Sequence, residues 1–312
     1  MQTIANKGTS IMDSTTKSII CSLTKNATCF LNCSIEAINR GLHIYSNKII
    51  AIVNMQMTLE LAMKARIVEK YGVPLIVKGL DVNASEEEIR EKYENNSFEI
   101  KEFDRLKNFL KSEQLFDFTK TEFKYMDRFQ TYRNKLVHFN YNFSVKENEQ
   151  IEQDIFYVLV FLLGTIMSNA LKSDDPTYMQ KYINGDQYKK LMQNQNYLTA
   201  LNAFLVDNYR NTYYCPICSR KTLTPSKKCL GCLCDLSADS FTYGYIDCKY
   251  CHMESSVIYD KLNINHNNGI TRGICISCQT DTILYKCIHC GKVCDLEGIE
   301  DKCTPELCLN KD

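Results

Sequence analysis

Cysteine is the residue type best suited to chemistry in this sequence. Of 17 cysteines in 312 residues, three lie near the start, and fourteen crowd into residues 215–308 after 181 residues without one. Twelve of the fourteen form close pairs: Cys215/Cys218, Cys229/Cys232, Cys248/Cys251, Cys275/Cys278, Cys287/Cys290 and Cys303/Cys308. A tetrahedral zinc ion takes four thiolates, and a pair separated by two residues supplies two of them from one tight turn. The paired cysteines therefore predict bound Zn²⁺.

Taken in order along the chain, the pairs predict about three zinc sites. Their spacings are C-x2-C-x10-C-x2-C, C-x2-C-x23-C-x2-C and C-x2-C-x12-C-x4-C, and the first two resemble zinc ribbons. Cross-bracing, in which alternate pairs share a metal, is an alternative that the spacing leaves open. Four thiolates leave no position for water, so we expect structural rather than catalytic zinc. Further side chains that could replace a ligand are Cys234, Cys294, His252 and His289.

For the three cysteines near the start, the sequence predicts free thiols and not metal ligands. Cys21, Cys29 and Cys33 lie within apolar or helix-like sequence, so we expect them to be buried free thiols. Residues 1–20 are mostly polar and lack the apolar stretch of a secretory signal. We therefore expect a cytoplasmic location, where cysteines stay reduced and metal sites are favoured over disulfides.

A second reactive pattern is the stretch from Tyr132 to His138, with the sequence YRNKLVH. Histidine transfers protons near neutral pH, and arginine offers a permanently charged fork that matches phosphate oxygens. Cleaving RNA without a metal requires deprotonation of a 2′-hydroxyl, stabilisation of a negatively charged phosphorus centre and protonation of the leaving oxygen. We assign His138 as the acid/base and Arg133 as the phosphate stabiliser. Asn134 would orient the imidazole or hold a phosphate oxygen.

Helical geometry separates the two principal residues of this pattern. Arg133 and His138 lie about 140° apart around a helix that turns about 100° per residue. One helix does not easily bring both to a small substrate, whereas two copies facing each other across a two-fold axis could. The sequence therefore predicts a homodimer. Glu60 and Lys64, one turn apart on another predicted helix, are supporting candidates, with a solvated ion pair as the alternative.

The motif Arg133-Asn134-x-x-x-His138, preceded by the helix around residues 59–64, resembles the HEPN superfamily (higher eukaryotes and prokaryotes nucleotide-binding domains) over residues 45–170. The resemblance implies a bundle of four or five helices, dimerisation that joins two R-x4-6-H motifs, and metal-independent RNA cleavage. Family members serve as toxins, antiphage effectors and CRISPR-associated nucleases. For this chain it implies an endoribonuclease with an RNA substrate, acting in antiviral defence or as a toxin, with no cofactor for catalysis.

Helical periodicity covers most of the sequence before residue 212. We expect helices over 46–71, 85–95, 99–113, 120–139 and 147–171, a short leading helix over 30–46, and one or two trailing helices over 177–210. The longest apolar run, 155–167, is too short to span a bilayer, so it predicts a core helix and no membrane partner. The expected fold is mainly α: an N-terminal HEPN-like helical bundle followed by small zinc-stapled β-hairpins, or zinc ribbons.

The expected domains are a helical extension (1–44), the bundle (45–172), a helical connector (173–212) and the zinc-ribbon region (213–312). In the last region β-prone stretches alternate with cysteine pairs, no amphipathic helix is evident, and Asn268-Gly269 predicts a hairpin turn.

The net charge of the zinc-ribbon region indicates which class of partner it can bind. It holds 11 lysines and arginines against 12 aspartates and glutamates, and thiolates bound to zinc would add negative charge. A protein trigger or inhibitor therefore suits this region better than nucleic acid, and a transcription factor is disfavoured. A short basic strip is expected to be a solvated hairpin: Arg220, Lys221, Lys227 and Lys228. The alternative overall function is a non-catalytic adaptor whose ribbons bind a protein partner.

Overall fold

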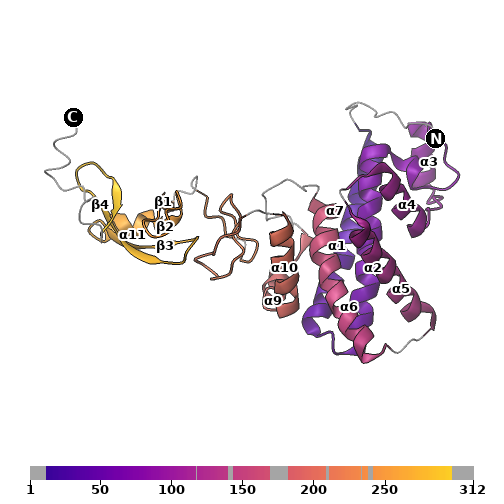
Figure 1. Cartoon of the computed structure of the whole chain (residues 1–312). Coiled ribbons are helices and arrows are strands. Elements are labelled where there is room, and N and C mark those ends of the chain that lie inside the picture. The colour runs from indigo at the N-terminus through magenta and orange to yellow at the C-terminus, as the bar shows by residue number, and fades with distance from the viewer. Residues whose placement is uncertain are drawn as a thin grey trace. The chain divides into compact units, whose positions relative to one another are not determined.

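The computed structural model describes residues 12–116, 118–139, 143–168, 182–208, 211–232, 234–237 and 242–296 (Figure 1). The chain forms two compact units, with the described residues up to Leu201 in the first and those from Asn202 onward in the second. The first unit is helical. The second contains an antiparallel sheet and the clustered cysteines.

Helices form nearly all regular structure of the described residues up to 208. They are α1 (Ser14–Arg40), α2 (Tyr45–Tyr71), η1 (Val73–Leu75), α3 (Glu86–Glu94), α4 (Phe103–Glu113), α5 (Lys120–Phe139), α6 (Val145–Tyr157), η2 (Val158–Leu163), α7 (Gly164–Ser168), α9 (Gly185–Leu191) and α10 (Gln195–Asn208). The expectation of a short leading helix is wrong in extent, because α1 has 27 residues. It begins where Asp13 accepts a hydrogen bond from the backbone N–H of Thr16, and it ends at Gly41, whose φ of +106° suits glycine.

The helices α1 and α2 form an antiparallel pair (Figure 1). Ser34 donates a hydrogen bond to the Ala51 carbonyl (2.9 Å), and Thr58 donates one to the Ala27 carbonyl (3.4 Å). Small residues at these points let the two backbones approach closely. Because α2 also contacts α4, α5, α6 and α7, it is the central helix of the bundle.

The last long helix of the bundle changes its winding along its length. It begins with a capping box between Ser144 and Glu147, continues through α6, becomes the π-helix η2 at Val158 and finishes as α7. The helix expected over 147–171 therefore begins two residues earlier, and its residues 169–171 lie outside the described part. In the described chain, the stretch Val145–Met167 is long and apolar enough to cross a membrane, but 78% of its apolar window is buried in the protein, as in a core helix.

The second unit contains one five-stranded antiparallel sheet with the strand order β1-β2-β3-β4-β5. The strands are β1 (Tyr243–Ile246), β2 (Val257–Asp260), β3 (Ile270–Cys275), β4 (Asp281–Lys286) and β5 (Val293–Asp295). The hairpins that were expected to be separate thus share one sheet. The described residues of 211–237 pair through isolated bridges such as Tyr213–Leu223.

One connection of this sheet differs from the sequence expectation. Asn268 and Gly269 form a turn with φ values of 52° and 79°, but it joins the short helix α11 (Lys261–His266) to β3 instead of joining two strands. The helix forms because the Asp260 side chain accepts hydrogen bonds from the N–H groups of Leu262 and Asn263. Six residues are too few to show clear amphipathic periodicity.

Candidate functional site

Eight of the paired cysteines come together as two groups of four. The first group is Cys215, Cys218, Cys229 and Cys232, and the second is Cys248, Cys251, Cys275 and Cys278. Within each group the four sulfur atoms lie within 4.8 Å of one another, so each group could hold a metal ion. Pairs adjacent in the chain combine, as their order predicted, and these groups are not cross-braced.

The sulfur–sulfur distances fit a tetrahedral metal site. In the first group they are 3.7 Å for both Cys215–Cys232 and Cys218–Cys229. In the second they are 3.8 Å between Cys248 and Cys278 and 3.7 Å between Cys251 and Cys275. A tetrahedron with metal–sulfur bonds of about 2.3 Å has edges of about 3.8 Å. The donor set and its dimensions therefore fit a structural Zn²⁺ ion held by four thiolates.

All five described C-x2-C pairs use the same backbone turn. The N–H of the first cysteine donates to the carbonyl five residues later: Cys215 to Arg220, Cys229 to Cys234, Cys248 to Met253, Cys275 to Thr280 and Cys287 to Lys292. In four of these turns the fourth residue after the first cysteine has a φ between 56° and 72°: Ser219, His252, Gln279 and Gly291. The turn is local, which explains why spacing alone predicts it.

Hydrogen bonds to sulfur favour the thiolate form that binds metal. The Cys229 sulfur accepts from the backbone N–H groups of Gly231 (3.2 Å) and Cys232 (3.3 Å), and it lies 3.2 Å from the Thr222 hydroxyl. A Cβ at Gly231 would lie 2.5 Å from that hydroxyl and 3.4 Å from the Cys218 sulfur. Glycine at this position leaves room for the first group to close.

Both groups also belong to small hydrophobic cores. Cys215 and Cys229 are buried with Leu223, Leu236, Ile258 and Ile276. Cys248 and Cys275 are buried with Val257, Ile264 and Leu284. These clusters are small for a unit of this size, so bound metal would supply cohesion that apolar burial alone does not.

The remaining predicted metal ligands do not belong to the two four-cysteine groups. Cys287 and Cys290 form the fifth turn, but Cys303 and Cys308 lie outside the described residues, so the predicted third site has no described geometry. His252 is exposed at the positive-φ position of its turn and His289 is exposed, and neither belongs to a described four-sulfur group. Cys294 is buried on β5 and also lies outside both groups.

The expectation of buried thiols at the N-terminus is wrong. Cys21, Cys29 and Cys33 all lie on the exposed side of α1. The core-facing side of this helix is formed by other residues, including Leu31, Ile35 and Ile38. Because cysteine counts as an apolar residue in a periodicity pattern, the sequence alone did not show which face of this helix is buried and which is exposed.

The arginine–histidine motif lies at the C-terminal end of α5. Arg133 is half-buried and donates a hydrogen bond to the Asn134 side chain (3.0 Å). His138 is in the last turn of this helix, and its imidazole lies outside the described part. The structure therefore places Arg133 and Asn134 together.

Arg128, one turn and a half before Arg133, has a different environment. Its guanidinium donates two hydrogen bonds, each 2.7 Å long, to the fully buried carboxylate of Asp154 on α6. Gln150 and the hydroxyl of Tyr132 also donate to this carboxylate, at 2.9 Å each. Burial, and then the negative charge of Asp154, raise the pKa of Tyr132 well above its usual value, so the phenol remains a donor.

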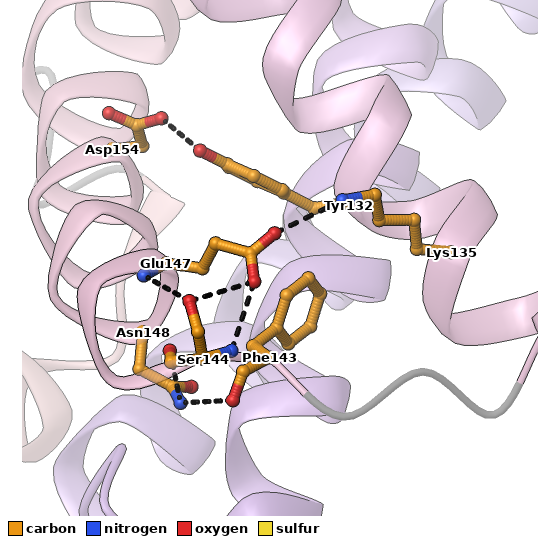
Figure 2. Close-up of polar contacts among 7 residues, drawn as sticks. All are labelled: Tyr132, Lys135, Phe143, Ser144, Glu147, Asn148 and Asp154. Atoms are coloured by element: carbon orange, nitrogen blue, oxygen red, sulfur yellow. Dashed lines mark hydrogen bonds and ion pairs between the residues drawn. The ribbon is translucent and has the colours of Figure 1, made fainter.

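A second contact joins the ends of α5 and α6 (Figure 2). Lys135 lies 3.2 Å from Glu147, the residue that completes the capping box with Ser144. The backbone N–H of Ser144 and then the Lys135 ammonium lower the pKa of Glu147 to about 2. Because Lys135 lies between Arg133 and His138 in the sequence, this pair braces the segment of α5 that carries the motif.

Glu60 and Lys64 form an ion pair with a distance of 2.5 Å on α2. The Lys64 side chain is 8% exposed and that of Glu60 is 23% exposed, so the ion pair of the alternative is formed but only partly solvated. Asp154 is a functional residue that the sequence pattern signals but that was not predicted. It lies one turn from the buried residues Ile151 and Val158 and next to the buried Ile155, on a face where a charged residue requires a partner.

The basic strip of the second unit is engaged in structural contacts. The Lys227 ammonium lies 4.9 Å from the ring centre of Tyr213 and 5.4 Å from that of Tyr245, and it donates to the Ser255 carbonyl. Burial lowers the pKa of Lys227. Lys228 lies 4.0 Å from Asp235. The Lys221 ammonium also lies 5.8 Å from the ring centre of Tyr214, so three of the four residues of the strip make contacts within the unit, and the strip is not a simple solvated hairpin.

In comparisons with known proteins, no family model, curated protein or solved structure matches this chain.

Proposed function

We propose that this protein is a metal-independent endoribonuclease of the HEPN type, acting as a toxin or in antiphage defence. The main observation behind this proposal is the environment of the Arg133 guanidinium. Among the described residues its guanidinium has no carboxylate partner and contacts Asn134, whereas Arg128 on the same helix is neutralised by Asp154. A half-buried guanidinium without an acidic partner is suited to bind a phosphate group.

The roles of the motif follow from its chemistry. His138 transfers protons to or from the ribose hydroxyl and the leaving oxygen, and Arg133 stabilises the negative charge that develops at phosphorus. Asn134 holds the Arg133 guanidinium through a 3.0 Å hydrogen bond, which limits the directions in which the fork points. Glu60 and Lys64 neutralise each other, which favours a supporting role in the bundle.

The active form in this proposal is a homodimer. Transesterification needs a base and an acid on opposite sides of the phosphorus, and one copy of the motif supplies one histidine. A two-fold axis beside the C-terminal half of α5 provides the second histidine without a second motif. The bracing of α5 by Asp154 and Glu147 supports the proposal, because a rigid helix end lets two motifs meet in a defined groove.

The metal of the two four-cysteine groups is Zn²⁺ in this proposal, with a third ion bound by Cys287, Cys290, Cys303 and Cys308. Zinc stabilises the second unit and takes no part in cleavage, because four thiolates fill its coordination sphere. The unit would then recruit a protein trigger or inhibitor.

RNA cleavage by the purified zinc-loaded chain tests this function. Arg133→Ala and His138→Ala should each lower the cleavage rate by at least about 100-fold, because each removes a group that acts in the transition state. Arg90→Ala, which removes an exposed arginine on α3, is the matched control and should leave the rate unchanged. Brief EDTA treatment should not stop cleavage. Full activity in both motif variants would exclude the site.

A non-catalytic adaptor is the second candidate. It is favoured by exposed apolar side chains that lie between the cysteines of three pairs: Ile217 (58% exposed), Tyr250 (48%) and Ile288 (77%). Apolar tips on rigid turns suit contact with a protein. A stable complex with a protein partner, together with no RNA cleavage when that partner is added or removed, would favour the adaptor over the nuclease.

A further inference from the structure

The first four-cysteine group has a fifth sulfur beside it. The Cys234 sulfur lies 3.4 Å from that of Cys215, closer than the 3.7 Å between Cys215 and Cys232 within the group. Cys234 is half-buried and packs against the same hydrophobic cluster that contains Cys215. In the described residues, no additional cysteine approaches the sulfurs of the second group in this way.

Five sulfurs exceed what one tetrahedral zinc ion binds. Four thiolates complete the coordination sphere, so one sulfur stays outside it and next to a metal-bound thiolate. Cys234 is that sulfur when Cys215, Cys218, Cys229 and Cys232 bind the metal. It is therefore the one sulfur of the five that can be oxidised without first breaking a metal–sulfur bond.

We propose that Cys234 is an oxidation site that forms a reversible disulfide with Cys215 when the protein meets a hydroperoxide. Cys234 first takes the terminal oxygen of the hydroperoxide and becomes a sulfenic acid, while water or an alcohol leaves. The Cys215 thiolate then attacks the Cys234 sulfur, the S–S bond forms, and hydroxide leaves and takes up a proton. Two thiols lose two electrons in total, and the hydroperoxide gains them.

The geometry favours this pair of sulfurs. A disulfide bond is about 2.05 Å long, so the two atoms need to approach by a little over 1 Å from their present separation. Cys234 is accessible enough for a small oxidant, while the buried Cys215 sulfur meets it from inside the cluster. The first step, oxidation to the sulfenic acid, therefore takes place at the Cys234 sulfur and not at the Cys215 sulfur.

The disulfide removes Cys215 from the set of metal ligands. Three sulfurs then remain, so the first group loses its zinc, while the second group keeps four thiolates and its zinc. The described residues of 211–237 pair through isolated bridges, so they depend on this metal more than the sheet does. A hydroperoxide would thereby loosen the first cysteine group selectively.

The test uses the full-length chain loaded with zinc and treated with increasing hydrogen peroxide. Zinc release is followed with a chromophoric chelator, and disulfides are mapped by mass spectrometry after the free thiols are alkylated. We expect an early phase of release that coincides with a Cys215–Cys234 disulfide and is reversed by dithiothreitol and fresh zinc. Cys234→Ser and Cys234→Ala should bind zinc normally and need about tenfold more peroxide for this phase, because their group lacks the outer thiol.

Cys33→Ser is the matched control, because it removes an exposed cysteine of α1 that belongs to neither four-sulfur group. It should keep the early phase. An unchanged early phase in both Cys234 variants, or an early disulfide that joins other cysteines, would overturn the proposal. Loss of zinc from the untreated Cys234 variants would also overturn it, since Cys234 would then be a ligand. None of these readouts depends on RNA cleavage.

Discussion

The buried carboxylate of Asp154 on α6 accepts two hydrogen bonds of 2.7 Å from the guanidinium of Arg128 on α5. The Tyr132 hydroxyl donates to the same carboxylate, so three hydrogen-bond donors of α5 hold this helix in one rotation about its axis. Arg133 follows Tyr132 directly in the sequence. The direction in which the candidate catalytic arginine leaves the helix is therefore set by a carboxylate on the neighbouring helix.

Replacing this carboxylate should destabilise the helical unit. Asp154→Asn leaves the Arg128 charge without its counterion, and we expect the free energy of unfolding to fall by about 3 kcal/mol. Urea unfolding followed by circular dichroism at 222 nm measures the loss. Asp186→Asn, at a side chain that is 87% exposed and 3.5 Å from Lys189, should change it by less than about 0.5 kcal/mol. Equal effects of the two substitutions would contradict a structural role for Asp154.

The capping box should make stability depend on acid pH through Glu147. Its folded pKa of about 2 lies below the usual value of 4.5, so the stabilisation is fully present above pH 4.5 and is lost as the pH falls toward 2. The melting temperatures of the wild type and Glu147→Gln should therefore differ at pH 7 and converge between pH 4.5 and pH 2. Glu149→Gln, in the same helix, serves as the control. A difference that stays constant over this range would show that ionisation of Glu147 has no part in it.

Removing metal should unfold the cysteine-rich second unit while leaving the helices of the first unit intact. A strong chelator takes zinc from the two groups, whose hydrophobic clusters are small. Limited proteolysis followed by mass spectrometry should then cut within residues 211–296, while the fragment that contains α1 to α7 survives and the ellipticity at 222 nm changes little. Simultaneous loss of all helical signal would mean that the two units fold as one.

Mixing inactive chains tests the dimer. If cleavage needs an arginine and a histidine from different copies, then Arg133→Ala and His138→Ala chains should together regain a fraction of the wild-type rate, because some mixed dimers hold one intact set. Each variant alone is the control and stays inactive. Sedimentation analysis gives the oligomeric state in parallel, and a monomer that cleaves RNA at the full rate would exclude a shared groove.

The cysteine groups show how much the sequence determines when the interactions are local. Each C-x2-C turn closes through a hydrogen bond between residues five apart, so neighbouring pairs could be recognised from spacing, and the two described groups combine in that order. The main helices followed from periodicity for the same reason, since Gly72 and Ser85 mark helix ends within a few residues.

Only the tertiary structure decided the features that depend on distant residues. Cys21, Cys29 and Cys33 are exposed because α1 turns other residues toward α2 and α9, and periodicity does not say which apolar face finds a partner. Arg128 and Arg133 lie on the same predicted helix, and nothing in the sequence pattern distinguishes their roles. Only Arg128 binds Asp154, which lies 26 residues after it in the sequence. The Cys234 sulfur lies beside that of Cys215 for the same physical reason. These contacts act over only a few ångströms, so they depend on which distant residues the folded chain places side by side.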